Sequence, residues 1–195
     1  IMGILNLTPD SFSDGGDFFD QESALVQVET FINYGVDVID FGAQSTRPGA
    51  EEVGSAIEIE RLIPILREVR NRFPNIIISI DTFNSDVAFE ALLNGANWIN
   101  DVTGGRRDEE IYKVVSEFDC PFVITHSRGN SQTMNDLTDY KNLIEDIIDN
   151  LKILIEKAIS KGVNTNKIIV DPGLGFAKNT YQNILVLKNL KKFKE

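Results

Sequence analysis

Short apolar runs alternate along the chain with longer stretches in which apolar residues recur every three or four positions. The short runs predict buried strands, and the longer amphipathic stretches predict helices. Strands are expected over residues 1–5, 36–41, 76–80, 98–99, 122–125 and 168–170. Helices are expected over residues 21–34, 58–72, 85–94, 109–118, 143–161 and 181–192. Regular alternation of strand and helix is typical of a parallel sheet covered by helices.

A polar side chain follows or ends each apolar run, and these polar residues are regularly spaced: Asn6, Asp40, Asp81, Asn100, His126 and Asp171. The mean spacing of about 33 residues, repeated eight times, approaches the ~250 residues of a TIM (β/α)8 barrel. We therefore expect an α/β fold in which residues 1–195 form a single domain with six of the eight barrel units. An open, doubly wound six-stranded sheet is the alternative. In both folds ligands bind at the carboxyl ends of the strands.

Composition excludes several classes of function. The formal net charge is −11, which disfavours binding to nucleic acid or to an anionic membrane surface. A single cysteine, Cys120, suits a reducing compartment such as the cytoplasm, and a single histidine, His126, excludes multi-histidine zinc sites. The chain opens inside an apolar run, so we expect its natural start to lie upstream.

Two polar segments follow the first two strands. Residues 6–16 contain Pro, Asp, Ser and Gly, and this composition is consistent either with a surface loop or with a lid over the strand ends. In the lid interpretation, the hard oxygen atoms of Asn6 and Asp14 suit Mg²⁺ bound together with substrate phosphates. In residues 45–49, Thr46 and the Arg47 guanidinium suit a phosphate or a carboxylate, although a turn with a solvated arginine remains the alternative.

Asp81, Asn100 and Asp171 follow later strands. Carboxylates accept hydrogen bonds from ring N–H and NH₂ groups, and an amide offers both a donor and an acceptor, so the three together suit a flat heterocycle. Carboxylates beside such a ring also stabilise a developing cation. Each aspartate taken alone is as often a helix cap or an ion-pair partner.

The motifs that contain these residues resemble those of dihydropteroate synthase. Residues 2–16 and 45–49 match its first two signatures, and residues 80–82, 100–105, 126–129 and 171–176 follow in the family's order. The resemblance implies condensation of (7,8-dihydropterin-6-yl)methyl diphosphate with 4-aminobenzoate, on the route to folate. It implies an SN1-like reaction in which Mg²⁺ assists departure of diphosphate. It also implies that sulfonamides target the enzyme.

The resemblance also implies roles for individual residues. The pterin is expected to contact Asp81, Asn100 and Asp171, and Asn6 is expected at the metal and the diphosphate together with Asp14. Catalytic roles are expected for Asp81, Asp14 and Arg47.

The remaining expected contacts concern the second substrate. Thr46 and Arg47 are expected near aminobenzoate and pyrophosphate, Phe12 and Asp14 on a closing first loop, and Phe176 at the border of the aminobenzoate pocket.

Other properties of the family are carried over as expectations. Its Ser-Arg-Lys and Arg-x-His motifs are absent from residues 1–195, so we expect the seventh and eighth strands to follow Glu195. The complete enzyme is expected to be a homodimer, cytoplasmic or mitochondrial, and in some organisms fused to a pyrophosphokinase and an aldolase. Two alternatives are a truncated, inactive pterin-binding remnant and a related methyltransferase that uses methyltetrahydrofolate and a corrinoid.

Overall fold

Six parallel strands form one sheet in the computed structural model, which describes residues 1–8, 21–44 and 53–194. The strands lie side by side in their order along the chain, from β1 to β6. This sequential order excludes the doubly wound alternative, in which the strand order reverses at a switch point. The strands are β1 (Met2–Asn6), β2 (Val38–Gly42), β3 (Ile77–Asp81), β4 (Trp98–Asp101), β5 (Phe122–Thr125) and β6 (Ile168–Asp171).

A helix follows each strand, as the sequence predicts. The helices are α1 (Gln21–Asn33), α2 (Ser55–Arg72), α3 (Ser85–Leu93), α4 (Glu110–Phe118), α5 (Leu143–Ser160) and α6 (Thr180–Lys188). Gly35 and Gly95 follow α1 and α3 with φ values of 77° and 98°, which a residue without Cβ adopts at little cost. Within the described residues, no helix is both long enough and apolar enough to span a bilayer.

The last expected helix is shorter than the sequence predicts. A capping box between Asn179 and Gln182 starts α6 at Thr180, one residue early. The α-helix stops at Lys188, and a 3₁₀ turn covers Leu190–Phe193. At the junction the Asn189 side chain donates to the Leu185 carbonyl, which is the local competition that makes asparagine a poor residue inside a helix.

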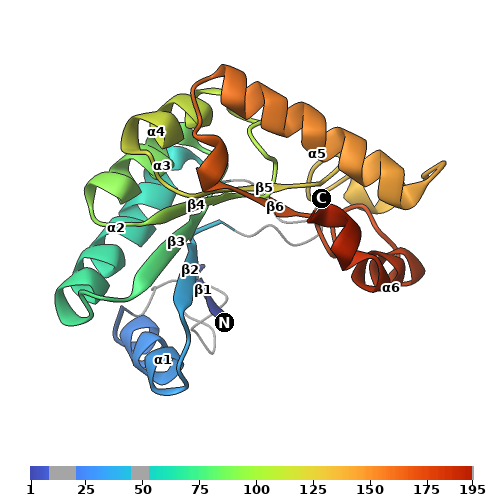
Figure 1. Cartoon of the computed structure of the whole chain (residues 1–195). Helices are drawn as coiled ribbons and strands as arrows, with labels where there is room; N and C mark the ends of the chain where they lie inside the picture. Colours follow the sequence, from blue (N-terminus) through green and yellow to red (C-terminus); the bar gives the residue numbers. More distant parts are fainter. Residues whose placement is uncertain (9–20, 45–52, 195) are drawn as a thin grey trace.

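The outer face of the sheet is apolar and forms the core. Side chains alternate between the two faces of a strand, and residues paired in register share a face. The helices α1 to α5 are arrayed around the outside of the curved sheet (Figure 1). Beneath them the outward-facing side chains are almost fully buried: Leu5, Ile39, Phe41, Ile78, Ile80, Ile99, Phe122 and Ile124.

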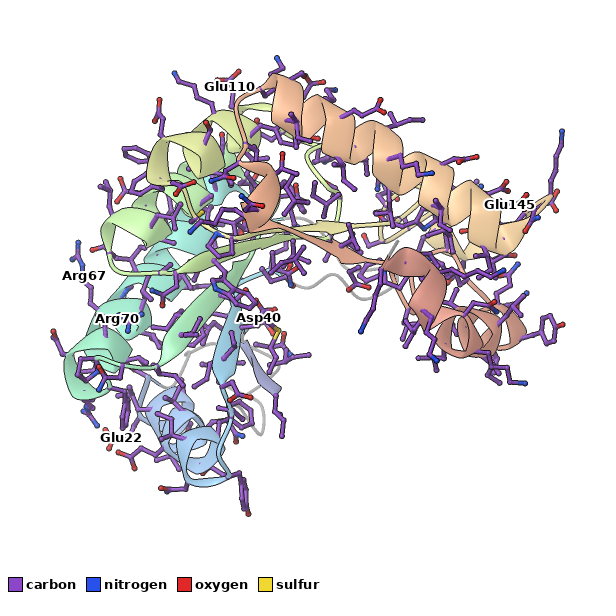
Figure 2. The ribbon with its side chains drawn as sticks, viewed as in Figure 1. Glu22, Asp40, Arg67, Arg70, Glu110 and Glu145 are labelled. Atoms are coloured by element: carbon purple, nitrogen blue, oxygen red, sulfur yellow. The ribbon has the colours of Figure 1, made fainter. Side chains whose placement is uncertain are left out.

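The inner face carries the polar residues near the strand ends. By the same alternation, these residues point away from the helices: Asn6, Asp40, Ser79, Asp81, Asn100, Thr125 and Asp171. One prediction is wrong in detail. Asp40 does not end its strand, because β2 continues through Gly42. Asp40 therefore lies two residues before the carboxyl end of β2. Figure 2 shows Asp40 on the hollow side of the sheet.

Candidate active site at the carboxyl ends of the strands

Three of the predicted site residues lie in one row across the sheet. The strand register pairs Asn6 with Gly42, Gly42 with Asp81, and Asp81 with Asn100. Gly42 has no side chain, so the space above it stays open between its two neighbours. A Cβ atom at Gly42 would lie 3.5 Å from the Asp81 Oδ2 atom and 3.6 Å from the Asn6 Oδ1 atom. The row therefore presents one carboxylate and two amides around a gap left by glycine.

Asp40 lies beneath this row and fixes the Asn100 amide. The Asn100 Nδ2 atom donates to the Asp40 Oδ2 atom over 3.1 Å. With its nitrogen turned toward Asp40, Asn100 has its Oδ1 atom free to accept from another donor.

Three buried polar atoms of the inner face have no hydrogen-bond partner within the described residues: Asp40 Oδ1, Ser79 Oγ and Thr125 Oγ1. Buried polar atoms are usually satisfied by protein, water or ligand. Since all three atoms belong to the same face as the row, this face suits a ligand that carries its own donors and acceptors.

The electrostatics of the inner face favour a positively charged guest. Burial raises the pKa of Asp81 well above its ordinary value, and the nearby carboxylates of Asp40, Asp101 and Glu58 raise it further. Burial also raises the pKa of Asp40, against the hydrogen bond from Asn100, which lowers it. A cation among these groups would relieve the repulsion between them and favour the ionised form of Asp81.

Asp101, next to Asn100 in sequence, has a different role. It lies on the outer face, where its carboxylate accepts from the Thr103 and Gly105 amides at 2.7 and 2.6 Å. It therefore shapes the loop after β4, whereas Asn100 faces the hollow side. Strand alternation alone separates the two roles.

Glu58 of α2 shapes the loop after β3, as Asp101 shapes the loop after β4. Its buried carboxylate accepts from the Thr82 hydroxyl over 3.1 Å and from the Asn84 side-chain amide. The sequence analysis did not select Glu58, because a glutamate in an amphipathic helix looks like an exposed residue. It fixes the backbone directly after Asp81.

Asp171 ends β6 and is half-buried. Its Oδ1 atom accepts from the Gly173 amide over 2.7 Å, and its carbonyl accepts from the His126 amide over 2.9 Å. Register pairs it with Thr125, whose hydroxyl is one of the unpartnered atoms. Asp171 thus completes the polar face on the far side from Asn6.

A cavity of about 190 Å³ lies above the strand ends. Phe83 and Phe176 supply aromatic walls, and the Arg106 guanidinium reaches the Ser127 hydroxyl over 2.5 Å. Residues from the loops after β2 to β6 line it: Gln44, Phe83, Val102, Thr103, Arg106, Arg107, Ser127, Arg128, Gly129, Asn130, Ser131, Met134 and Phe176. The cavity therefore suits a partly aromatic ligand with an anionic end.

The other predicted residues, Phe12, Asp14, Thr46 and Arg47, lie outside the described residues. In the described ranges, no group of three or more His, Cys, Asp or Glu residues is arranged to hold a metal ion. Asn6 is exposed at the end of β1 with its amide oxygen near the Asp81 carboxylate. This hard-oxygen donor set fits Mg²⁺ only if a phosphate-bearing ligand supplies most of the coordination.

Comparison with known proteins decides the family. The profile of the pterin binding enzyme family matches residues 2–195. The dihydropteroate synthase of Clostridium beijerinckii is 45% identical to the chain over 195 residues, which are 100% of this chain and 70% of that protein. The chain belongs to the dihydropteroate synthase family. Family membership also confirms the barrel interpretation, since the solved relatives superpose on this six-stranded sheet.

Two solved structures illustrate the match. A dihydropteroate synthase from Clostridium difficile, solved in the presence of pteroic acid, has a TM-score of 0.90 and 44% identity and covers 99% of this chain. The Yersinia pestis enzyme, in complex with a sulfonamide drug, has a TM-score of 0.92 and 34% identity and covers 100% of this chain. The chain covers 71% and 70% of these two structures, respectively.

A similar sequence also occurs within longer relatives. The folate synthesis bifunctional protein of Arabidopsis thaliana is 45% identical over 199 residues, and the chain spans 41% of its length. The chain therefore matches one part of a larger family protein in that case.

Proposed function

We propose that the protein is a dihydropteroate synthase. In this proposal it joins (7,8-dihydropterin-6-yl)methyl diphosphate to 4-aminobenzoate and releases diphosphate. The observation that carries the proposal is the polar inner face, where Asn6, Asp81 and Asn100 lie in one row beside or near the open space at Gly42 and Asp171 ends β6 on the same face. Related dihydropteroate synthases that were solved in the presence of pteroic acid and with 4-aminobenzoic acid support the choice of substrates.

The pterin ring is proposed to lie on the inner face. Asp171 and Asp81 accept from its N–H and NH₂ groups, and the Asn100 amide, turned by Asp40, offers its oxygen. As the diphosphate leaves, positive charge develops on the pterin methyl group. The Asp81 carboxylate, whose ionised form a neighbouring cation favours, stabilises that charge.

Aminobenzoate is proposed to enter from the cavity above the row. Phe176 borders its ring there, and Phe12 and Asp14 close over it after the pterin has bound. Thr46 and Arg47 are proposed to hold the diphosphate and to meet the second substrate. The C–O bond to diphosphate breaks first, and the amine nitrogen then attacks the methyl carbon. The amine proton leaves to solvent.

A divalent cation fits this proposal beside Asn6, at the end of β1. Asn6, with Asp14, would hold Mg²⁺ together with the diphosphate oxygens of the substrate. When bound, Mg²⁺ neutralises charge on the leaving diphosphate. The protein side chains contribute orientation of the pterin and stabilisation of the developing cation.

The experiment is a turnover assay on the intact protein with both substrates. We expect dihydropteroate, identified by mass, and diphosphate in a one-to-one ratio. Asp81→Asn should lower kcat by about 10²-fold, since it removes charge stabilisation of the developing cation. Asp86→Asn, an exposed aspartate in the first turn of α3, is the matched control and should leave kcat unchanged.

Two other results would replace the proposal. Pterin binding without any product would indicate an inactive pterin-binding remnant. Methyl transfer from methyltetrahydrofolate to a corrinoid, with no reaction of aminobenzoate, would indicate the methyltransferase.

A further inference from the structure

Lys178 is buried within the loop that connects β6 to α6. Only 7% of its surface is exposed, although lysine is among the residues least often buried. Its Nζ atom lies 2.8 Å from the Gly173 carbonyl, 3.0 Å from the Phe176 carbonyl and 2.9 Å from the His126 Nδ1 atom. An ammonium group has three N–H donors, so this geometry satisfies all of them.

The contact with Lys178 defines the state of His126. Because an ammonium group donates and cannot accept, the His126 Nδ1 atom must accept, and the ring proton must lie on Nε2. His126 is itself buried at the end of β5. Burial and the charges of Lys178, Arg106 and Arg128 lower its pKa to about 3, so the imidazole is neutral.

The loop around Lys178 contains one residue in an unfavourable backbone conformation, Ala177. Gly173, Gly175 and Ala177 have φ values of 71°, 82° and 49°. A left-handed conformation at a residue with a Cβ, such as Ala177, costs roughly 1–2 kcal/mol. Such a residue persists only where its surroundings determine it, and Ala177 lies between Phe176 and Lys178.

Other hydrogen bonds hold the loop to Tyr140 and to α6, and one of them reaches its centre at Gly175. The Tyr140 hydroxyl donates to the Ala177 carbonyl over 3.0 Å, and the Asn183 side chain accepts from the Gly175 amide over 2.9 Å. Among the hydrogen bonds of the described residues, those from Lys178 alone join the Gly173 and Phe176 carbonyls to β5. The Phe176 ring, attached at this point, forms one wall of the cavity.

We propose that Lys178 is a positioning residue, which clamps the β6–α6 loop onto His126 and thereby holds Phe176 at the wall of the cavity. The proposal rests on the proposed function, in which Phe176 borders aminobenzoate. Without the ammonium group, the Gly173 and Phe176 carbonyls and the imidazole nitrogen each lose one donor. The left-handed Ala177 then relaxes, and Phe176 moves away from the second substrate while Asp171, bonded separately to Gly173 and His126, stays in place.

The kinetic test compares Lys178→Met with Lys178→Arg in the intact protein. Lys178→Met keeps most of the side-chain volume and removes the donors. We expect it to raise KM for 4-aminobenzoate by about tenfold or more, because a small displacement of a positioning group has a large effect. Affinity for the dihydropterin diphosphate should change less than about threefold. Lys178→Arg, which retains charge and donors, should recover part of the loss.

Lys188→Met, an exposed lysine at the end of α6, is the control and should leave both constants unchanged. Equal losses of pterin affinity and aminobenzoate KM in Lys178→Met would overturn the proposal, because a general loss of folding moves both. Unchanged kinetics would also overturn it.

The spectroscopic test does not depend on catalysis. The ¹⁵N shifts of the His126 ring in the intact protein should show the neutral form with the proton on Nε2. In Lys178→Met the ring should titrate closer to its ordinary range, since a neighbouring positive charge is gone. A proton on Nδ1 in the unsubstituted protein would overturn the clamp even if Lys178→Met fails to fold. If the protein makes no dihydropteroate, the proposed function fails, and the ¹⁵N measurement still decides whether Lys178 clamps the loop.

Discussion

Arg70 joins three elements at the end of the barrel opposite the site, and its removal should be costly. Arg70 lies near the end of α2. Figure 2 shows Arg70 at the periphery of the molecule. Its guanidinium makes five hydrogen bonds. Two reach the Gly95 carbonyl at 3.1 and 2.7 Å, and the others reach the Pro74 and Ile76 carbonyls and the Asn97 Oδ1 atom at 2.9, 2.8 and 2.7 Å.

The size of the effect follows from which acceptors water can reach. The bonds to Pro74 and Asn97 are exposed, so water replaces the guanidinium there at little cost. The bonds to Gly95 and Ile76 are partly buried. Losing a charged donor at two such acceptors costs ~1.5–2 kcal/mol each, so Arg70→Met should lower the free energy of unfolding by ~3–4 kcal/mol.

The assay is urea unfolding of the intact protein, followed by circular dichroism. Arg72→Met is the matched control on the same helix, because Arg72 is exposed and forms an exposed ion pair with Glu68 one turn away, at 2.7 Å. We expect no measurable change in its urea midpoint. Equal losses in the two variants, or no loss in Arg70→Met, would refute the view that Arg70 fastens α2 to β3 and β4.

Three further predictions concern the loops around the site. Gly173→Ala should lower turnover more than about tenfold, because its Cβ would lie 1.9 Å from the His126 carbonyl oxygen, whereas Gly175→Ala meets no atom within 4 Å and should lose only a little stability. Tyr112→Phe should cost ~1–2 kcal/mol by calorimetric melting, since its buried hydroxyl donates to a carbonyl over 2.7 Å, whereas Tyr181→Phe, at an exposed position, should be neutral. His126 has a pKa of about 3 in the folded protein, below its unfolded value of 6.5, so its contribution to stability is lost as pH falls from 6.5 to about 3. His126→Gln should therefore flatten the curve of unfolding free energy against pH in this range. An unchanged slope would contradict the lowered pKa of His126.

The repeating strand pattern was sufficient to predict the fold. Each expected strand exists within a few residues of its predicted place, because parallel strands covered by helices are rich in apolar residues. The polar residues after these runs converge, as expected for the carboxyl edge of parallel strands. Asp81, Asn100 and Asp171 accordingly share the inner face, with Asn6 at one end of the row.

Residues whose role depends on distant partners could not be predicted in this way. Lys178 meets His126 across 52 positions of sequence, and Arg70 meets Gly95 across 25. Nothing in the local pattern separates either residue from an exposed basic side chain. Asp40 was placed at a strand end because the apolar run stops there, yet Phe41 and Gly42 extend β2 beyond it.

The central claim is that the inner face holds a dihydropterin, and calorimetric titration tests it most directly. The intact protein, titrated with a dihydropterin diphosphate analogue, should bind it at one site. Asp171→Asn should weaken binding by ~1–3 kcal/mol, because one ring donor loses its carboxylate acceptor. Asp149→Asn, an exposed aspartate of α5, should bind as the unsubstituted protein does. Equal affinity in Asp171→Asn and Asp149→Asn, or no binding to the unsubstituted protein, would contradict the account.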